Sequence, residues 1–138
     1  MLLQLAVDVP TMEAALKLCD ETRDYIDIIE VDAPLITAGT DCCAIFKERY
    51  PEKIIYADGK FCDMGRLMQA YNKGADSGTM TVNANDKAFE MGIEYAHSHG
   101  KTLAVDYVDV KNFAERTYVL DRMGVDIISF GIALEPEY

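Results

Sequence analysis

The segment KIIYADGKFCD, residues 53–63, joins a short β-rich apolar run to a charged cluster and then to a helical pattern. The helical pattern, DMGRLMQAYNKG (63–74), ends at Gly74, a residue type that commonly follows the last turn of a helix. The same order of run and helix recurs at a spacing of about 25 residues along the chain. The runs are LLQLAVD (2–8), DIIEV (27–31), KIIYAD (53–58), DSGTMTV (76–82), KTLAVD (101–106) and DIISFG (126–131).

Helical patterns fill the intervals between several of these runs. TMEAALKLCDETRD (11–24) begins with Thr11 as an expected N-cap, and its apolar residues follow helical spacing. NDKAFEMGIEYAHSHG (85–100) and VKNFAERTYVLDRMG (110–124) both end in glycine. Alternating strands and helices indicate parallel strands with right-handed crossovers, in either a closed barrel or an open doubly wound sheet. The even period and the absence of glycine after the first strand favour the barrel.

The number of units is smaller than a complete barrel requires. Six strands and five helices are expected from the patterns, whereas a (β/α)8 TIM barrel has eight of each. The sequence therefore predicts an α/β protein in which residues 1–138 form one partial barrel domain, with the first five βα units plus strand six. Its first and sixth strands should be unpaired edges, and the tail GIALEPEY (131–138) should be a loop.

Composition and charge exclude several classes of function. The chain has 24 acidic and 13 basic residues and a net charge of −11, which disfavours a nucleic-acid partner. The spacing of the four cysteines matches no zinc motif, and we expect them to be reduced thiols of an intracellular protein. The amino terminus lacks a signal-peptide pattern and no apolar run approaches a membrane span. We therefore expect a cytoplasmic protein without a membrane partner.

Acidic side chains lie at or near the ends of four of the expected strands. These are Asp8, Glu30, Asp58 and Asp106. Active sites of parallel α/β barrels gather at the carboxyl ends of the strands, so these acids are candidate site residues. The alternative is that each acid caps the helix that follows, as aspartate commonly does.

The motif YADGKFCD places Lys60 between Asp58 and Asp63. On an extended chain, residues 58 and 60 point to the same side. Neighbouring carboxylates favour the charged form of a lysine, which can then donate a hydrogen bond or a proton to an enolate. Glu30 and Asp58 are candidate ligands for Mg²⁺, a cation that prefers oxygen ligands and could stabilise an enediolate formed from a ketose. The alternative is a surface ion-pair cluster.

Five segments together resemble the 3-hexulose-6-phosphate synthases of the orotidine 5′-phosphate decarboxylase superfamily. The superfamily signature Asp-x-Lys-x-x-Asp is met by Asp58, Lys60 and Asp63. 3-Keto-L-gulonate-6-phosphate decarboxylase is a close relative of these synthases. The segments are LQLAVD, YIDIIEVDAP, YADGKFCDMG, LAVDYVDVKNFAER and MGVDIISF.

The resemblance implies an aldolase-type lyase that joins formaldehyde to ribulose 5-phosphate through a Mg²⁺-stabilised enediolate. The product would be 3-hexulose 6-phosphate, and the family fold is a (β/α)8 barrel, usually a homodimer. Asp106 matches the acid that ends the fifth strand of the family. The VDYVDV segment is more similar to the synthases than to the gulonate-phosphate decarboxylases, which remain the alternative.

The same resemblance implies a role for each site residue. Glu30 and Asp58 would bind the metal, and Asp8 and Lys60 would contact the sugar. Asp63 would reach into the active site of the neighbouring subunit.

The sequence also departs from the family pattern. Asp32 stands where the family usually has a glycine after the strand-two glutamate, Gly59 replaces an aliphatic residue, and Gly131 replaces a histidine. We expect Asp32 to change the charge near the metal and Gly59 to loosen its strand. The family's phosphate-binding loops follow strands seven and eight, which are not among the six strands found here. A non-catalytic barrel fragment that acts as an assembly or binding subunit is therefore a further alternative.

Overall fold

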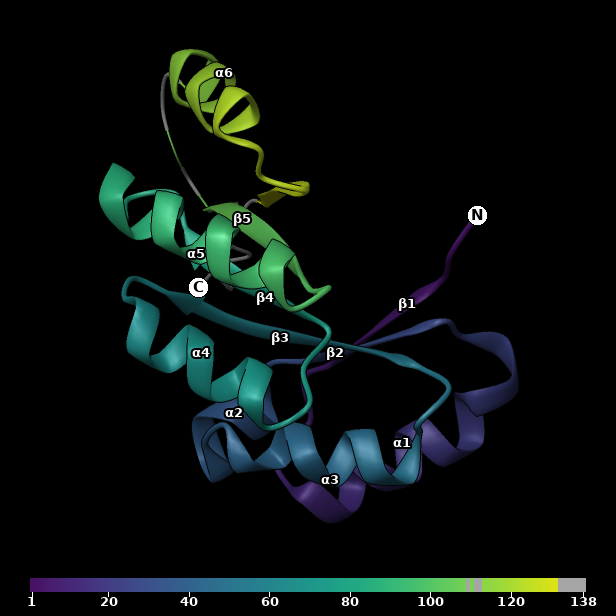
Figure 1. Cartoon of the computed structure of the whole chain (residues 1–138). Coiled ribbons are helices and arrows are strands. Elements are labelled where there is room, and N and C mark those ends of the chain that lie inside the picture. The colour runs from purple at the N-terminus through teal and green to yellow at the C-terminus, as the bar shows by residue number, and fades with distance from the viewer. Residues whose placement is uncertain (109, 111–112, 132–138) are drawn as a thin grey trace.

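A computed structural model describes residues 1–108, 110 and 113–131. All six strands are parallel and lie in the order in which they occur in the sequence, so each strand pairs with the next. The sheet curls into a half-barrel with the helices along its outer side (Figure 1). The elements are β1 (Gln4–Val7), α1 (Met12–Thr22), the 3-10 helix η1 (Arg23–Tyr25), β2 (Ile28–Val31), α2 (Ala33–Ala38), α3 (Asp41–Arg49), β3 (Ile54–Phe61), α4 (Met64–Asn72), β4 (Ser77–Thr81), α5 (Asp86–Ser98), β5 (Thr102–Val108), α6 (Phe113–Met123) and β6 (Ile127–Gly131).

The strand order confirms the partial barrel and excludes the doubly wound alternative. A doubly wound sheet reverses its strand order at a switch point, and no reversal occurs among the described strands. The central strands β3, β4 and β5 are buried over most of their length, as strands with both faces covered should be. In the described part of the chain, β1 pairs only with β2 and β6 only with β5, as expected for edge strands. The expected tail loop (131–138) lies almost wholly outside the described residues.

The start of α1 has the N-cap expected from the sequence. The Thr11 hydroxyl accepts a hydrogen bond from the amide of Ala14, 3.2 Å away, at the start of α1. Two short helices, α2 and α3, occupy the interval between β2 and β3, so the count of five helices was one too low for the described residues. The interval was difficult to interpret because Gly39 divides it into two helices that are each too short to show a clear apolar period. None of the described helices is long and apolar enough to cross a bilayer.

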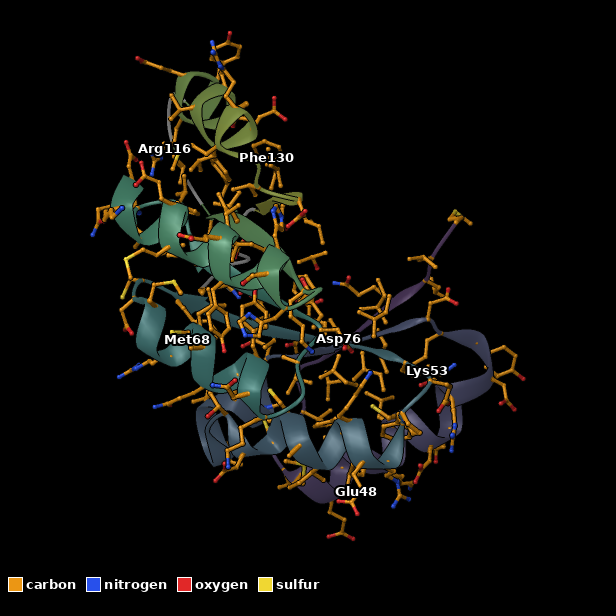
Figure 2. The ribbon with its side chains drawn as sticks, viewed as in Figure 1. Glu48, Lys53, Met68, Asp76, Arg116 and Phe130 are labelled. Atoms are coloured by element: carbon orange, nitrogen blue, oxygen red, sulfur yellow. The ribbon has the colours of Figure 1, made fainter. Side chains whose placement is uncertain are left out.

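The core lies between the sheet and the helices. Phe46 and Tyr50, near the end of α3, are fully buried, whereas Glu48 on the same segment points away from the sheet (Figure 2). Helix α4 approaches β4 closely because β4 has a glycine near its centre. A Cβ atom built on Gly78 would lie 2.6 Å from Cδ1 of Leu67, so any larger residue would push the helix and the strand apart.

At the amino-terminal end of the sheet, aspartates at the starts of alternate strands support the backbone of the preceding strand. The carboxylates of Asp27, Asp76 and Asp126 each accept a hydrogen bond from a backbone N–H in that strand or directly before it. The donors are Leu3 at 2.8 Å, Ile55 at 2.9 Å and Leu103 at 2.8 Å, in that order. This end of a barrel usually serves stability, so these acids have a structural role. The acids at the opposite end require another explanation.

Candidate active site

The carboxyl ends of the strands bring together several of the acids expected in the site. Glu30 lies in β2, Asp58 in β3 and Asp106 in β5, and Asp8 directly follows β1. Asp58 and Asp106 are buried, with 8% and 9% of their surface exposed. Parallel pairing places these positions at one end of the half-barrel because every strand runs in the same direction.

Lys60 lies among three carboxylates, two of which were expected in the site. Its Nζ donates a hydrogen bond to Oδ2 of Asp58, and it lies 3.6 Å from Oδ2 of Asp32 and 3.7 Å from Oδ2 of Asp106. Burial opposes the charge on Lys60, but the hydrogen bond to Asp58 and the three negative charges outweigh burial and raise the lysine pKa. The Lys60 side chain is 40% exposed, so this charged residue is partly accessible from solvent.

The backbone of β3 is not extended where it carries this lysine. The pairing of β3 with β4 changes register between Ala57 and Phe61, and Lys60 has φ 43°, the one positive value among described residues other than glycine. Asp58 and Lys60 therefore meet through a bulge, not through the strand alternation assumed from the sequence. We expected Gly59 to loosen the strand, but the structure shows that it makes room for the ring of Phe61. A Cβ atom built on Gly59 would lie 2.2 Å from Cζ of Phe61.

Glu30 shares the site with Asp58 and Asp8. Burial, together with the negative charges of Asp58 and Asp8, raises the pKa of Glu30 to about 7, although a hydrogen bond from Gln4 opposes this effect. That bond runs from Nε2 of Gln4 to Oε2 of Glu30 at 2.6 Å. The Glu30 carboxyl group is therefore poised to change its charge near neutral pH.

Asp63 lies apart from the cluster around Lys60. It is exposed and is the N-cap of α4, where Oδ1 accepts a hydrogen bond from the amide of Arg66 at 3.1 Å. Among the described residues, the carboxylates within 4.0 Å of Lys60 are Asp58, Asp32 and Asp106. The expectation that Asp58 and Asp63 flank the lysine is thus wrong for Asp63, since capping turns its carboxylate towards the helix.

Sequence reasoning missed two polar residues of the site. Thr79, in the middle of β4, contacts both Asp58 and Lys60, and Gln4 of β1 binds Glu30. No signal in the sequence singled out Thr79, because β4 also carries the hydroxyls of Ser77 and Thr81. The site also opens towards a pocket of about 870 Å³ between α2, the end of β3 and α4. Its lining includes Asp32, Leu35, Lys60, Phe61, Arg66 and Gln69.

The donor chemistry suits a hard cation only in part. In the described chain, no three histidine, cysteine, aspartate or glutamate side chains are grouped as a metal site. Mg²⁺, however, is usually held by one or two carboxylates and takes its other ligands from water and substrate. Glu30 and Asp58 could supply the two carboxylates that such a Mg²⁺ site needs. In this structure one oxygen of Asp58 is paired with Lys60.

Fold and site together define a partial (β/α) barrel with a lysine–carboxylate cluster at the carboxyl ends of its strands. The chain belongs to the orotidine 5′-phosphate decarboxylase / HUMPS family, whose sequence model matches residues 1–135. It is 33% identical to the 3-hexulose-6-phosphate synthase of Mycobacterium gastri over 140 residues, which cover 99% of this chain and 68% of that protein.

Solved structures agree with this assignment. A crystal structure of a 3-hexulose-6-phosphate synthase superposes with a TM-score of 0.90 at 31% identity, covering 100% of this chain and 70% of the other. The structure of 3-keto-L-gulonate-6-phosphate decarboxylase from Vibrio cholerae superposes with a TM-score of 0.85, covering 92% of this chain and 60% of the other. At 19% sequence identity, this similarity shows a shared fold alone. The chain spans 62% to 68% of the length of curated relatives that it matches.

Proposed function

We propose that this chain is an aldolase-type lyase that joins formaldehyde to ribulose 5-phosphate, forming 3-hexulose 6-phosphate. The observation that carries the proposal is the charged Lys60 held among Asp58, Asp32 and Asp106 at the carboxyl ends of the strands. Relatives named 3-hexulose-6-phosphate synthase support the choice of reaction.

The residues of the cluster suit the proton transfers of this reaction. A carboxylate removes a proton from the carbon beside the ketose carbonyl, and the released electron pair forms the new bond to the formaldehyde carbon. Asp106 suits the role of base because burial raises its pKa, although the nearby Lys60 opposes this. Lys60 donates a hydrogen bond to the oxygen on which negative charge develops. The formaldehyde oxygen then takes up the proton that the carboxylate removed, so the reaction is an addition without a leaving group.

Glu30 and Asp58 would hold Mg²⁺ in this proposal. The cation would stabilise negative charge on the ketose oxygens when bound. Asp8 would contact the sugar from the end of β1. Asp63, which is exposed at the start of α4, would act in the site of the second subunit of a homodimer. Sedimentation that shows a stable monomer would contradict this dimer.

The test is formaldehyde-dependent consumption of ribulose 5-phosphate with and without Mg²⁺. Lys60→Ala should abolish turnover, whereas Lys17→Ala should not, because Lys17 is a surface lysine whose side chain is 75% exposed. Turnover that survives Lys60→Ala would contradict the proposed mechanism. Consumption of 3-keto-L-gulonate 6-phosphate with release of carbon dioxide would instead select the decarboxylase, the alternative enzyme.

A second candidate is a non-catalytic assembly or binding subunit. It is favoured by the two open sheet edges of the described residues and by the added carboxylate of Asp32 beside Lys60. If neither Mg²⁺ nor a sugar phosphate shifts the melting temperature, and Lys60→Ala behaves as the unaltered protein does, this candidate replaces the lyase. The acidic composition supports the further proposal of a cytoplasmic protein that does not bind nucleic acid.

A further inference from the structure

Thr79 connects the two central residues of the site from a neighbouring strand. Its side chain lies in β4 and is 1% exposed. The Thr79 hydroxyl oxygen lies 2.7 Å from Oδ1 of Asp58 and accepts a hydrogen bond from the backbone N–H of Lys60 at 3.0 Å. The carbonyl oxygen of Ala57 is farther away, at 3.3 Å, so the single hydroxyl proton is best directed to the carboxylate.

These contacts occur where β3 departs from regular pairing. The register of β3 on β4 shifts between Ala57 and Phe61, and Lys60 adopts a left-handed backbone conformation. A non-glycine residue keeps such a conformation only when its surroundings hold it there. The hydroxyl of Thr79 provides an acceptor for an amide that has left the regular ladder.

The same hydroxyl determines which oxygen of Asp58 pairs with Lys60. With Oδ1 bound to Thr79, Oδ2 is the oxygen that pairs with Nζ of Lys60. The Thr79 side chain therefore holds both the backbone of Lys60 and the Asp58 carboxylate that pairs with the lysine ammonium group.

We infer that Thr79 is a positioning residue, whose hydroxyl holds the bulge at Lys60 and orients Asp58 so that the ammonium group of Lys60 faces the site. Its effect on turnover rests on the proposed lyase function. Its effect on the Lys60 backbone does not, so the two can be tested separately.

The decisive comparison is between Thr79→Val and Thr79→Ser. Valine has the shape of threonine without the hydroxyl, and serine keeps the hydroxyl. Ser77→Ala is the matched control, because Ser77 lies two residues earlier on the same strand, is also 1% exposed, and its hydroxyl contacts only the carbonyl of Thr102 at 3.4 Å among the described residues. If the valine variant does not fold, Thr79→Cys replaces it, since a thiol is a weak hydrogen-bonding group.

The first measurement is hydrogen exchange at the Lys60 amide by NMR, which needs no activity. We expect exchange in Thr79→Val to be at least about tenfold faster than in the unaltered protein, as for the loss of one buried hydrogen bond. Thr79→Ser and Ser77→Ala should keep the original protection. Unchanged protection in Thr79→Val, or equal loss in the serine variant, would overturn the inference.

The second measurement is turnover under the conditions proposed above. Thr79→Val should lower kcat by about tenfold or more with a smaller change in KM, and Thr79→Ser should restore most of kcat. If no protein turns over substrate, the proposed function fails while the exchange experiment still decides the role of Thr79. If Thr79→Val loses amide protection but keeps full kcat, positioning by Thr79 does not serve catalysis and that part of the inference is wrong.

Discussion

Replacing Glu30 with glutamine should stabilise the protein at alkaline pH. The folded structure raises the pKa of Glu30 from its ordinary value of 4.5 to about 7 through burial and the charges of Asp58 and Asp8. Between these two pH values the folded protein keeps a proton that the unfolded chain releases, so the free energy of unfolding falls as pH rises. The glutamine side chain cannot lose a proton, and its carbonyl oxygen can still accept the hydrogen bond from Gln4.

The size of the effect follows from the two pKa values. At about 1.36 kcal/mol per pH unit, the difference corresponds to about 3 kcal/mol for a fully buried group. Glu30 is only half-buried, and solvent screening reduces the expected gain at pH 8 to about 1–2 kcal/mol. The gain should shrink to less than about half at pH 5.5, because there the unaltered folded protein is mostly protonated at this site.

Urea denaturation followed by circular dichroism, with EDTA present, measures the effect at both pH values. Glu48→Gln is the matched control, since Glu48 is exposed on α3 and points away from the sheet (Figure 2). In separate melts with Mg²⁺ and without EDTA, the glutamine variant at position 30 should also lose any stabilisation that Mg²⁺ gives the unaltered protein. A variant that is no more stable than the unaltered protein at pH 8, or a gain that is the same at pH 5.5, would refute the reasoning.

Three further substitutions separate structural from functional roles. Asp76→Ala should lower the free energy of unfolding by about 1–3 kcal/mol, because it leaves the amide of Ile55 unpaired. Urea melts should show this loss, and Mg²⁺ affinity measured by calorimetry should not change. Gly59→Leu should destabilise the protein by about 1–3 kcal/mol by displacing the ring of Phe61, and a similar urea midpoint for both proteins would contradict that packing. Asp63→Ala should cost about 1 kcal/mol as a lost N-cap, whereas Asp63→Asn should keep the cap. Turnover assays should then show loss in both variants if the charge acts in catalysis, and normal rates in Asp63→Asn would leave capping as the only role.

The helices and strands were predictable because their signals are local. The cap at Thr11 and the stop at Gly74 were each expected from a few neighbouring residues, and the structure has them. The paired helices α2 and α3 were not resolved into two, since each is too short to show a clear apolar period. The half-barrel itself followed from the regular spacing of the apolar runs.

The arrangement of the site was less accessible from the sequence. Asp58, Lys60 and Asp106 were identified as site residues by their positions at the ends of strands, and the structure brings them together. Asp32 was noticed only as a departure from the family, although it lies beside Lys60. Thr79 was missed because it is one of three hydroxyl-bearing residues in β4, with Ser77 and Thr81, and no pattern in the sequence distinguishes it from the other two.

The sequence by itself determined the alternation of strands and helices, the parallel sheet, and the end of that sheet at which acids collect. These features depend on apolar periodicity and on chain direction, which can be read without knowing any long-range contact. Only the tertiary structure decided which carboxylates surround Lys60. The conformation of that lysine is left-handed and is held by a hydroxyl from β4, so its neighbours depend on a contact between residues nineteen positions apart.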